Sequence, residues 1–198
     1  MGVTPDAPLL AALQQRAIET AESFQAQSIT DLMCAFARMG ITPDAPLLEA
    51  MLTRASRITF DSMTTVDLFW ALAKMGIEPD AILREPEQLR QYRARYSDLH
   101  PTNPGAHLWA LAKMGIEPNR YDMEKLQLSA TAMAGDFNAQ NIAEILWALS
   151  VMEKQFTLHP RLLKAMQKRT TELAGDFDPK GLASVLASFA KMGITPDA

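Results

Sequence analysis

The sequence predicts an all-α protein, a right-handed α-solenoid of tandem helix-turn-helix repeats with five repeats and about ten helices. Two observations lead to this prediction. A Met-Gly pair, followed by a short turn that contains Pro, recurs about every 38 residues. Between these marks, apolar residues recur at helical spacing. A single helical hairpin cannot bury its apolar side alone, so we expect successive hairpins to stack side by side.

The recurring mark divides the chain into repeats of nearly constant length. It stands at Met1-Gly2, Met39-Gly40, Met75-Gly76, Met114-Gly115 and Met192-Gly193, and Met152-Glu153 fills the remaining place. The pattern predicts a single solenoid over residues 1–198. Its repeats cover approximately residues 1–38, 39–74, 75–113, 114–151 and 152–191, and residues 192–198 begin a sixth.

The first helix of each repeat is expected to begin after a Pro-Asp pair. Asp6, Asp44 and Asp80 stand at this point and can accept hydrogen bonds from the free N–H groups of the first turn. Apolar residues such as Leu47 and Met51 then follow at a spacing that places them on one side of the helix.

The second helix of each repeat is expected to begin at Asp61, Asn138 or Asp178 and to end at the Gly of the mark. A Gly suits this position because it adopts the left-handed conformation that often follows a helix. Three apolar columns recur in this helix. Their members are Leu32, Leu68, Ile145 and Val185; Met33, Phe69, Leu108, Leu146 and Leu186; and Phe36, Leu72, Leu111, Leu149 and Phe189.

Trp70, Trp109 and Trp147 occupy one further position of the second helix, between apolar neighbours. This setting favours packing in the core over a role as stacking platforms. His107 falls in an otherwise apolar column, so we expect it to be partly buried.

Composition and motifs argue against several functions. The formal charge is −4, so any binding of nucleic acid must come from the local placement of charge. Cys34 is the only cysteine, which excludes an internal disulfide and a cysteine-based zinc site. There is no phosphate-binding glycine loop or nucleophile motif. We therefore expect no enzymatic activity, no cofactor and no bound metal. No stretch is apolar and long enough to cross a membrane, and no signal peptide is present.

The end of the second helix carries a specific signature. It reads Leu-Phe-Trp-Ala-Leu-Ala-Lys-Met-Gly over residues 68–76, His-Leu-Trp-Ala-Leu-Ala-Lys-Met-Gly over 107–115 and Ile-Leu-Trp-Ala-Leu-Ser-Val-Met-Glu over 145–153. This resembles the octotricopeptide repeat, although the first and fifth repeats lack the Trp. The resemblance implies modular binding of single-stranded RNA, about one nucleotide per repeat, in the stability, processing or translation of transcripts. It also implies action in a chloroplast or mitochondrion, with a bacterial protein as the alternative.

Three columns of the second helix are candidates for contact with RNA. Counted back from the Gly of the mark, they lie twelve, nine and two residues before it, on one face of the helix. The base-reading candidates are Ser28 and Asp31, Thr64 and Asp67, Asn103 and Ala106, Asn141 and Glu144, and Gly181 and Ser184. The phosphate-binding candidates are Arg38, Lys74, Lys113 and Lys191. A further column, five residues before the Gly, is always small and would let RNA approach closely.

The chemistry of this face admits two interpretations. Short polar side chains and carboxylates one turn apart could read the edge of an unstacked base, and one cation per repeat could bind phosphate. However, polar residues near a helix start also serve as caps, and basic residues near its end complement the helix dipole. A local basic cluster with tyrosines, in residues 84–96, could also help to hold RNA.

Two other hypotheses remain open. The acidic total charge is also compatible with a protein-protein interaction scaffold, such as a bacterial effector or an assembly factor. The chain starts with MGVTPDA and ends with MGITPDA, so its open repeat ends could associate head to tail.

Overall fold

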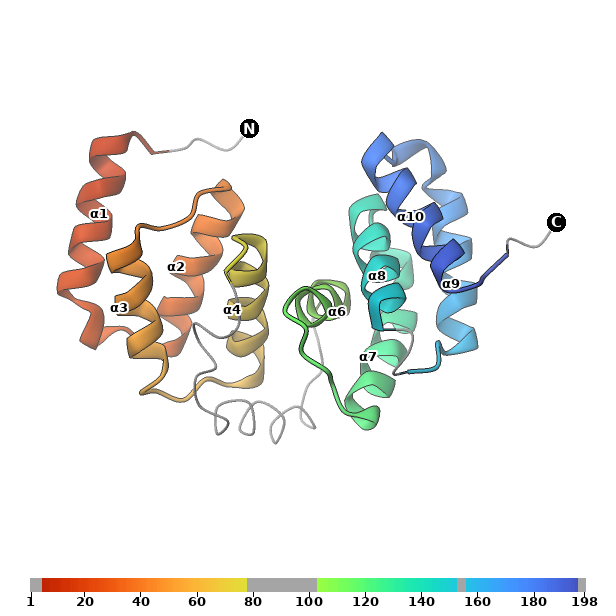
Figure 1. The fold of residues 1–198 in the computed structure, drawn as a ribbon, viewed down its shortest axis with the longest axis horizontal. Helices are drawn as coiled ribbons and strands as arrows, with labels where there is room; N and C mark the ends of the chain where they lie inside the picture. Colours follow the sequence, from red (N-terminus) through yellow and green to blue (C-terminus); the bar gives the residue numbers. More distant parts are fainter. Residues whose placement is uncertain (1–4, 78–102, 153–155, 196–198) are drawn as a thin grey trace. The chain divides into compact units, whose positions relative to one another are not determined.

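The computed structural model describes residues 5–77, 103–152 and 156–195. Within these ranges all regular structure is helical, which confirms the all-α class (Figure 1). The expected first helix of the third repeat, which Asp80 would cap, and the basic cluster of residues 84–96 lie outside the described residues.

The chain divides into two compact units, Met1–Asp98 and Leu99–Ala198. The first unit contains α1 (Ala7–Glu19), α2 (Ala26–Met39), α3 (Ala45–Ala55) and α4 (Ser62–Lys74). The second contains α6 (Pro104–Lys113), α7 (Arg120–Ala132), α8 (Ala139–Met152), α9 (Pro160–Glu172) and α10 (Pro179–Lys191). A continuous right-handed solenoid over both units stays a prediction.

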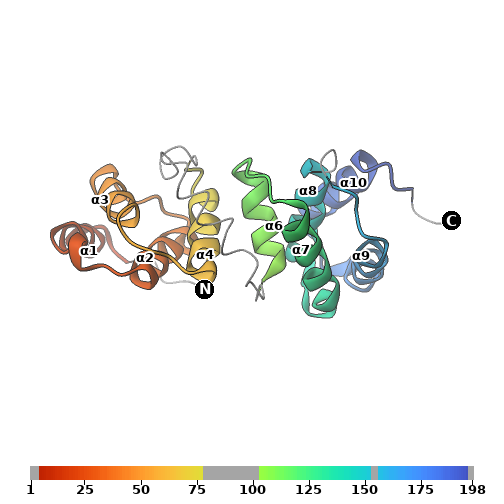
Figure 2. The same cartoon turned by 90° about the horizontal axis from the view of Figure 1, so that it is seen from below.

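Each unit is built in two layers. The second helices of successive repeats pack against one another, α2 with α4 in the first unit and α6 with α8 and α8 with α10 in the second. The first helices form the other layer, in which α1 lies beside α3 and α7 beside α9. In the second unit, Figure 2 shows α8 and α10 in one row and α7 and α9 in the other.

The helix starts follow the sequence closely. The side chain of Asp44 accepts a hydrogen bond from the Leu47 N–H at 2.9 Å, and Asp6 caps α1 in the same way. Asp61 and Asp178 cap α4 and α10. These carboxylates satisfy N–H groups that have no partner within the helix, and their positions confirm the predicted caps.

The helix ends show why a Gly recurs in the mark. Gly40 follows α2 with a φ angle of 68°, and Gly115 follows Met114, the C-cap of α6, with a φ of 63°. Side chains other than Gly are strained in this region of φ, because Cβ comes too close to the backbone. Gly40, Gly76, Gly115 and Gly193 therefore end α2, α4, α6 and α10 and turn the chain out of the helix.

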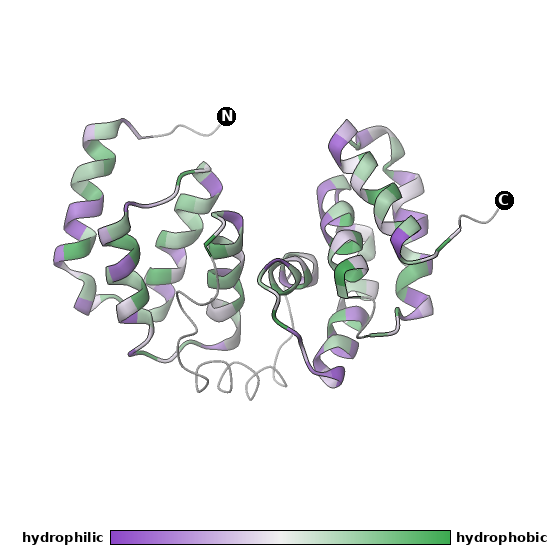
Figure 3. Ribbon diagram, in the orientation of Figure 1, coloured by the Kyte–Doolittle hydropathy of each residue, from purple (hydrophilic) through white to green (hydrophobic). Residues whose placement is uncertain are grey.

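The apolar columns form the core, as expected. In the first unit Ile29, Met33, Leu47 and Met51 are completely buried, and in the second Leu108 and Ile145 are. Figure 3 shows hydrophobic and hydrophilic residues on each helix, as helices that bury only one side require. Within the described residues, no helix is long and apolar enough to cross a membrane.

Some predicted core residues are less buried than expected. Leu186 of α10 is 59% exposed, although its counterparts Met33 and Leu146 are completely buried. The reason is that another second helix follows α2 and α8, and the described residues contain none after α10. The predicted core residues Trp70, Trp109 and Trp147 are only partly buried.

Candidate nucleic-acid interface

The four basic residues near the ends of the second helices lie at the surface. Arg38, Lys74, Lys113 and Lys191, here called the cation row, are all exposed and occupy one position of the repeat. In the fourth repeat Val151 takes this position and is 41% exposed. Arg38 and Lys74 belong to the first unit, and Lys113 and Lys191 to the second. Exposed long-chain cations can pair with phosphates of a nucleic-acid strand.

Aromatic rings lie beside two members of the cation row. The Nζ atom of Lys113 in α6 lies 5.6 Å from the ring centroid of Trp147 in α8. The Nζ atom of Lys74 lies 6.0 Å from the centroid of Trp70 in the same helix. Because both indoles are partly exposed, each pair combines a charge for phosphate with an aromatic surface next to it.

Arg38, one member of the cation row, also interacts with a carboxylate of the neighbouring helix α4. Desolvation raises the pKa of Asp67 in α4, and the charge of Arg38 in α2 acts against this by lowering it. Asp31 carries a second negative charge beside them and accepts a hydrogen bond from Gln27 at 2.8 Å. Arg38 therefore lies in a surface patch of both charge signs, where it is exposed and its positive charge stabilises the ionised form of Asp67.

The column twelve residues before the Gly is largely engaged in capping. Thr64 is only 6% exposed, and its hydroxyl donates a hydrogen bond to the Asp61 carboxylate at 2.8 Å. The Asn103 side chain accepts from the Ala106 N–H, and the Asn141 side chain accepts from the Asn138 N–H. Thr64 thus departs from the expected exposed face, because it fills the third position of a capped first turn.

The two remaining members of this column differ from the others. Ser28 is exposed at the surface of α2. Gly181 has no side chain with which to contact a base, and a Cβ added there would lie 2.9 Å from the Asp178 carboxylate that caps α10. In this column, therefore, some side chains form hydrogen bonds at a helix start, while Ser28 is exposed and Gly181 has no side chain.

The column nine residues before the Gly is more accessible. Asp31 and Asp67 are exposed, while Ala106, Glu144 and Ser184 are partly buried. The Glu144 carboxylate accepts a hydrogen bond from Gln140 at 3.0 Å. This column keeps carboxylates within reach of solvent in three repeats.

The small column five residues before the Gly is not open in most repeats, contrary to expectation. Ala71, Ala110, Ala148 and Ser188 are buried, and only Ala35 is exposed. Ala71 belongs to the core of the first unit, which includes residues of α2. The column is small because the helices pack closely there, which leaves no room for a strand of RNA.

The sequence pattern did not lead us to expect tryptophan rings beside the lysines of the cation row. The signal that could have revealed this arrangement is the four-residue spacing between the tryptophan and the basic residue, as in Trp70 and Lys74. This spacing places the two side chains on the same face of a helix. The apolar neighbours of the tryptophans had instead led us to expect their rings in the core.

Burial shifts the pKa of two further side chains, His107 and Cys34. Burial lowers the pKa of His107 to about 3, so this imidazole is neutral at pH 7. Burial raises the pKa of the Cys34 thiol to about 11. Over the described ranges, no group of three or more His, Cys, Asp or Glu side chains is arranged to hold a metal ion.

The comparison with known proteins places the chain in a family. No curated protein was found to match it. Residues 7–197 match the family model described as RNA-editing substrate-binding complex 6 protein, which covers nearly the whole of the helical array. The chain belongs to the RNA-editing substrate-binding complex 6 protein family, an RNA-related family of helical proteins.

Proposed function

We propose that the chain binds single-stranded RNA along the cation row. The observation that carries the proposal is the pairing of exposed lysines with partly exposed indoles, Lys74 with Trp70 and Lys113 with Trp147. Single-stranded nucleic acids are bound by just such a combination of cations for phosphates and aromatic faces for bases. The family name, which refers to the binding of RNA-editing substrates, supports the same function.

In this proposal each repeat meets about one nucleotide. Within each unit the second helices pack side by side, so equivalent positions repeat along the layer. A phosphate would contact a member of the cation row, and the adjoining base would stack on the exposed edge of an indole. The cation row is broken at Val151, where a phosphate would lack its basic contact.

Sequence preference is the finer part of the proposal and rests on the resemblance to octotricopeptide repeats. Asp31, Asp67 and Glu144 are the side chains best suited to read base edges, because their carboxylates are accessible. The capping residues Thr64, Asn103 and Asn141 contribute mainly by fixing the first turn of the helix. The same resemblance supports action on organellar transcripts, by binding and not by catalysis.

Titration with short RNAs over a salt series tests RNA binding. Replacing Lys74 and Lys113 with Glu should weaken binding and reduce the slope of log K against log salt by about 1.4, since about 0.7 is expected per lost phosphate contact. Lys164→Glu with Lys168→Glu is the matched control, because it makes the same charge change on α9. Equal losses in both variants, or no binding by the wild type at low salt, would contradict the proposal.

A second experiment tests sequence preference. Exchanging Asn141 and Glu144 for Thr and Asp reproduces in α8 the pair that stands in α4. Selection from a randomised RNA pool should then change the preferred base at one position only. A shift at several positions, or at none, would show that these residues do not read one base.

A protein-interaction scaffold is the second candidate function. It is favoured by exposed apolar side chains at the outer helices, Leu9 and Leu13 of α1 and Leu182 and Leu186 of α10. Exposed apolar residues of this kind support contact with a protein partner. Stable co-purification with a defined protein, together with indifference to RNA, would favour this candidate.

A further inference from the structure

Of the first helices that the structure describes, α9 carries the most positive charge. Four of its residues are basic and one is acidic, whereas α1, α3 and α7 each contain as many acidic as basic residues. Arg161, Lys164 and Lys168 are exposed. Because they are three and four residues apart, they lie on one face of the helix. This face of α9 is a basic stripe.

The basic stripe occupies a face that is open throughout the layer of first helices. Tyr121, Glu124 and Leu128 of α7 stand at the same three positions, counted from the N-cap of each helix. All three are exposed, although α9 packs against α7. A following helix thus leaves this face uncovered, and the exposure of the basic stripe does not depend on where the described helices end.

On α7 the same face is aromatic and apolar. Tyr121 is 55% exposed and Leu128 is 45% exposed. They lie two turns apart on one face, roughly 10 Å along the helix. The Nζ atom of Lys125 lies 4.7 Å from the centroid of the Tyr121 ring. Exposed apolar side chains that are bordered by cations are typical of contact sites for other proteins.

Hydrogen bonds between α7 and the start of α9 bring the two stripes together. Gln127 accepts from the N–H of His159 at 2.7 Å and donates to the Thr157 carbonyl at 3.3 Å. Leu128 is the next residue after Gln127, and Arg161 is two residues after His159, so the two stripes meet at this junction. We call the exposed surface formed by both stripes the α7–α9 surface; its residues are Tyr121, Lys125, Leu128, Arg161, Lys164 and Lys168.

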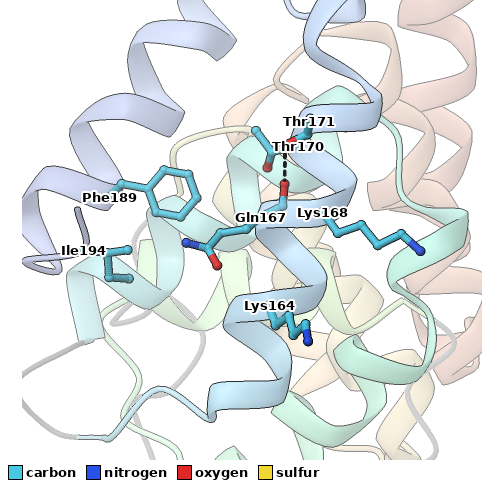
Figure 4. A pocket seen from close by; sticks show the side chains of 7 residues that line it. All are labelled: Lys164, Gln167, Lys168, Thr170, Thr171, Phe189 and Ile194. Carbon is cyan, nitrogen blue, oxygen red and sulfur yellow. Dashed lines mark hydrogen bonds between the residues drawn. The ribbon is translucent and has the colours of Figure 1, made fainter. Parts of the chain in front are cut away.

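Figure 4 shows how the two lysines extend from α9. The Gln167 side chain points toward Phe189 of α10, and the ammonium ends of Lys164 and Lys168 point away from that ring. The Lys168 side chain is 80% exposed, and its Nζ atom lies 3.9 Å from the Glu172 carboxylate. Because an exposed ion pair of this kind is weak, Lys168 can exchange Glu172 for the carboxylate of a partner.

We propose that the α7–α9 surface binds an acidic amphipathic helix of a partner protein. Apolar side chains of that helix pack against Tyr121 and Leu128, and its Asp and Glu side chains pair with Arg161, Lys164 and Lys168. The spacing of Tyr121 and Leu128 fits apolar residues two turns apart on one face of the partner helix.

The apolar half of this surface decides the class of partner. The basic stripe selects for negative charge, which RNA and acidic proteins both carry. Leu128, however, offers an RNA strand neither a charge nor an aromatic face, and the Lys125 ammonium already lies against the ring of Tyr121. An acidic amphipathic helix makes use of both halves. The α7–α9 surface lies on first helices and the cation row on second helices, so the inference does not rest on RNA binding.

Fluorescence anisotropy with a labelled peptide tests the proposal. The probe is a helical peptide with Leu side chains two turns apart and Glu side chains along the neighbouring side. It should bind the full chain at low salt, and the affinity should fall as salt is added. Lys164→Glu with Lys168→Glu should weaken binding at least about 10-fold, because attraction becomes repulsion. Lys74→Glu with Lys113→Glu, the same charge change on second helices, is the matched control and should bind the peptide as the wild type does.

Two further variants examine the α7 half. Tyr121→Ser with Leu128→Ser should weaken binding about 5- to 30-fold, because the apolar anchors are lost. Glu124→Lys places a cation at the position that Lys164 has in α9, so it should strengthen binding about 2- to 5-fold. All of these residues are exposed, and circular dichroism should show unchanged helical content.

Three results would overturn the proposal. The first is a wild type that does not bind the peptide at low salt. The second is equal binding of a peptide with the same residues in scrambled order, which would reduce the contact to net charge. The third is loss of short-RNA binding in Lys164→Glu with Lys168→Glu, which would make this an RNA surface. A cation row that fails to bind RNA would leave the peptide results unchanged, so the two proposals fail independently.

Discussion

The ammonium group of Lys113 in α6 lies 5.6 Å from the ring centroid of Trp147 in α8, so a cation and an indole of successive repeats meet at the surface. We predict that this pair contributes to stability. A double-mutant cycle with Lys113→Met and Trp147→Leu should give a coupling of about 0.5–1 kcal/mol in the free energy of urea unfolding.

Lys164 provides the control for this measurement. It lies on α9 and is exposed, so Lys164→Met should show no coupling to Trp147→Leu. Equal coupling energies in the two cycles would mean that the effect is a general one of net charge and not the contact between Lys113 and Trp147.

The arginines of the repeat junctions should stabilise the fold unequally. Arg54 donates through Nε to the Phe24 carbonyl at 3.0 Å, and Arg169 to the Phe137 carbonyl at 2.9 Å. Arg54→Met and Arg169→Met should each lower the free energy of unfolding by about 1–3 kcal/mol, because the carbonyl loses a charge-assisted hydrogen bond. Arg16→Met should cost about 0.5 kcal/mol or less, since Arg16 makes only an exposed ion pair within its helix. Comparing the three variants by urea denaturation of dilute monomer checks this, and a large loss in Arg16→Met would contradict it.

Acid should weaken the fold through His107. Its pKa in the folded chain is about 3, below its ordinary value of 6.5, because burial disfavours the imidazolium. The unfolded chain therefore binds the proton first, and stability falls as the pH drops below about 6.5, by about 1.4 kcal/mol per unit, toward pH 3. Above pH 6.5 this effect is absent.

Replacing His107 with Leu, the residue type at the same position in Leu68, removes this titration. The difference in unfolding free energy between variant and wild type should shift by about 2 kcal/mol between pH 7.5 and pH 5, in favour of the variant. His159→Asn, at the N-cap of α9, is the control. Parallel pH profiles for wild type and His107→Leu would show that His107 takes up a proton without unfolding.

The Gly of the repeat mark should be sensitive to substitution for conformational reasons alone. A Cβ at Gly115 would meet no atom within 4 Å, but the φ angle of 63° strains any other residue. Gly115→Ala should therefore lower the thermal midpoint, at a cost of about 1 kcal/mol. Gly135 is also open to a Cβ but lacks a positive φ, so Gly135→Ala should be neutral or slightly stabilising.

Much of the fold could be predicted because the signals are local. The caps at Asp44 and Asp61 act within one turn, and the left-handed Gly40 depends only on its own backbone. The periodic apolar residues also identified the buried side of each helix, as Met33 and Leu72 show. These features follow from the chemistry of a few consecutive residues.

The candidate site could be predicted only in part. The cation row is exposed as expected, since Lys and Arg keep their charged ends in water whatever surrounds them. Thr64 was expected to be exposed, but it is buried and its hydroxyl donates to the capping carboxylate of Asp61. Trp147 was expected in the core, but it is partly exposed beside a lysine of the preceding repeat. Neither environment can be inferred from the hydrophobicity of neighbours in the sequence.

The sequence by itself determined the repeat, the capped starts of several helices, such as those at Asp44 and Asp61, and the register that relates equivalent residues. The tertiary structure alone decided which equivalent residues are exposed. Leu146 and Leu186 occupy the same position, yet only Leu146 has a following second helix against it. Exposure depends on whether a neighbouring helix covers the residue, and the Lys113–Trp147 contact likewise exists only once two repeats are packed together.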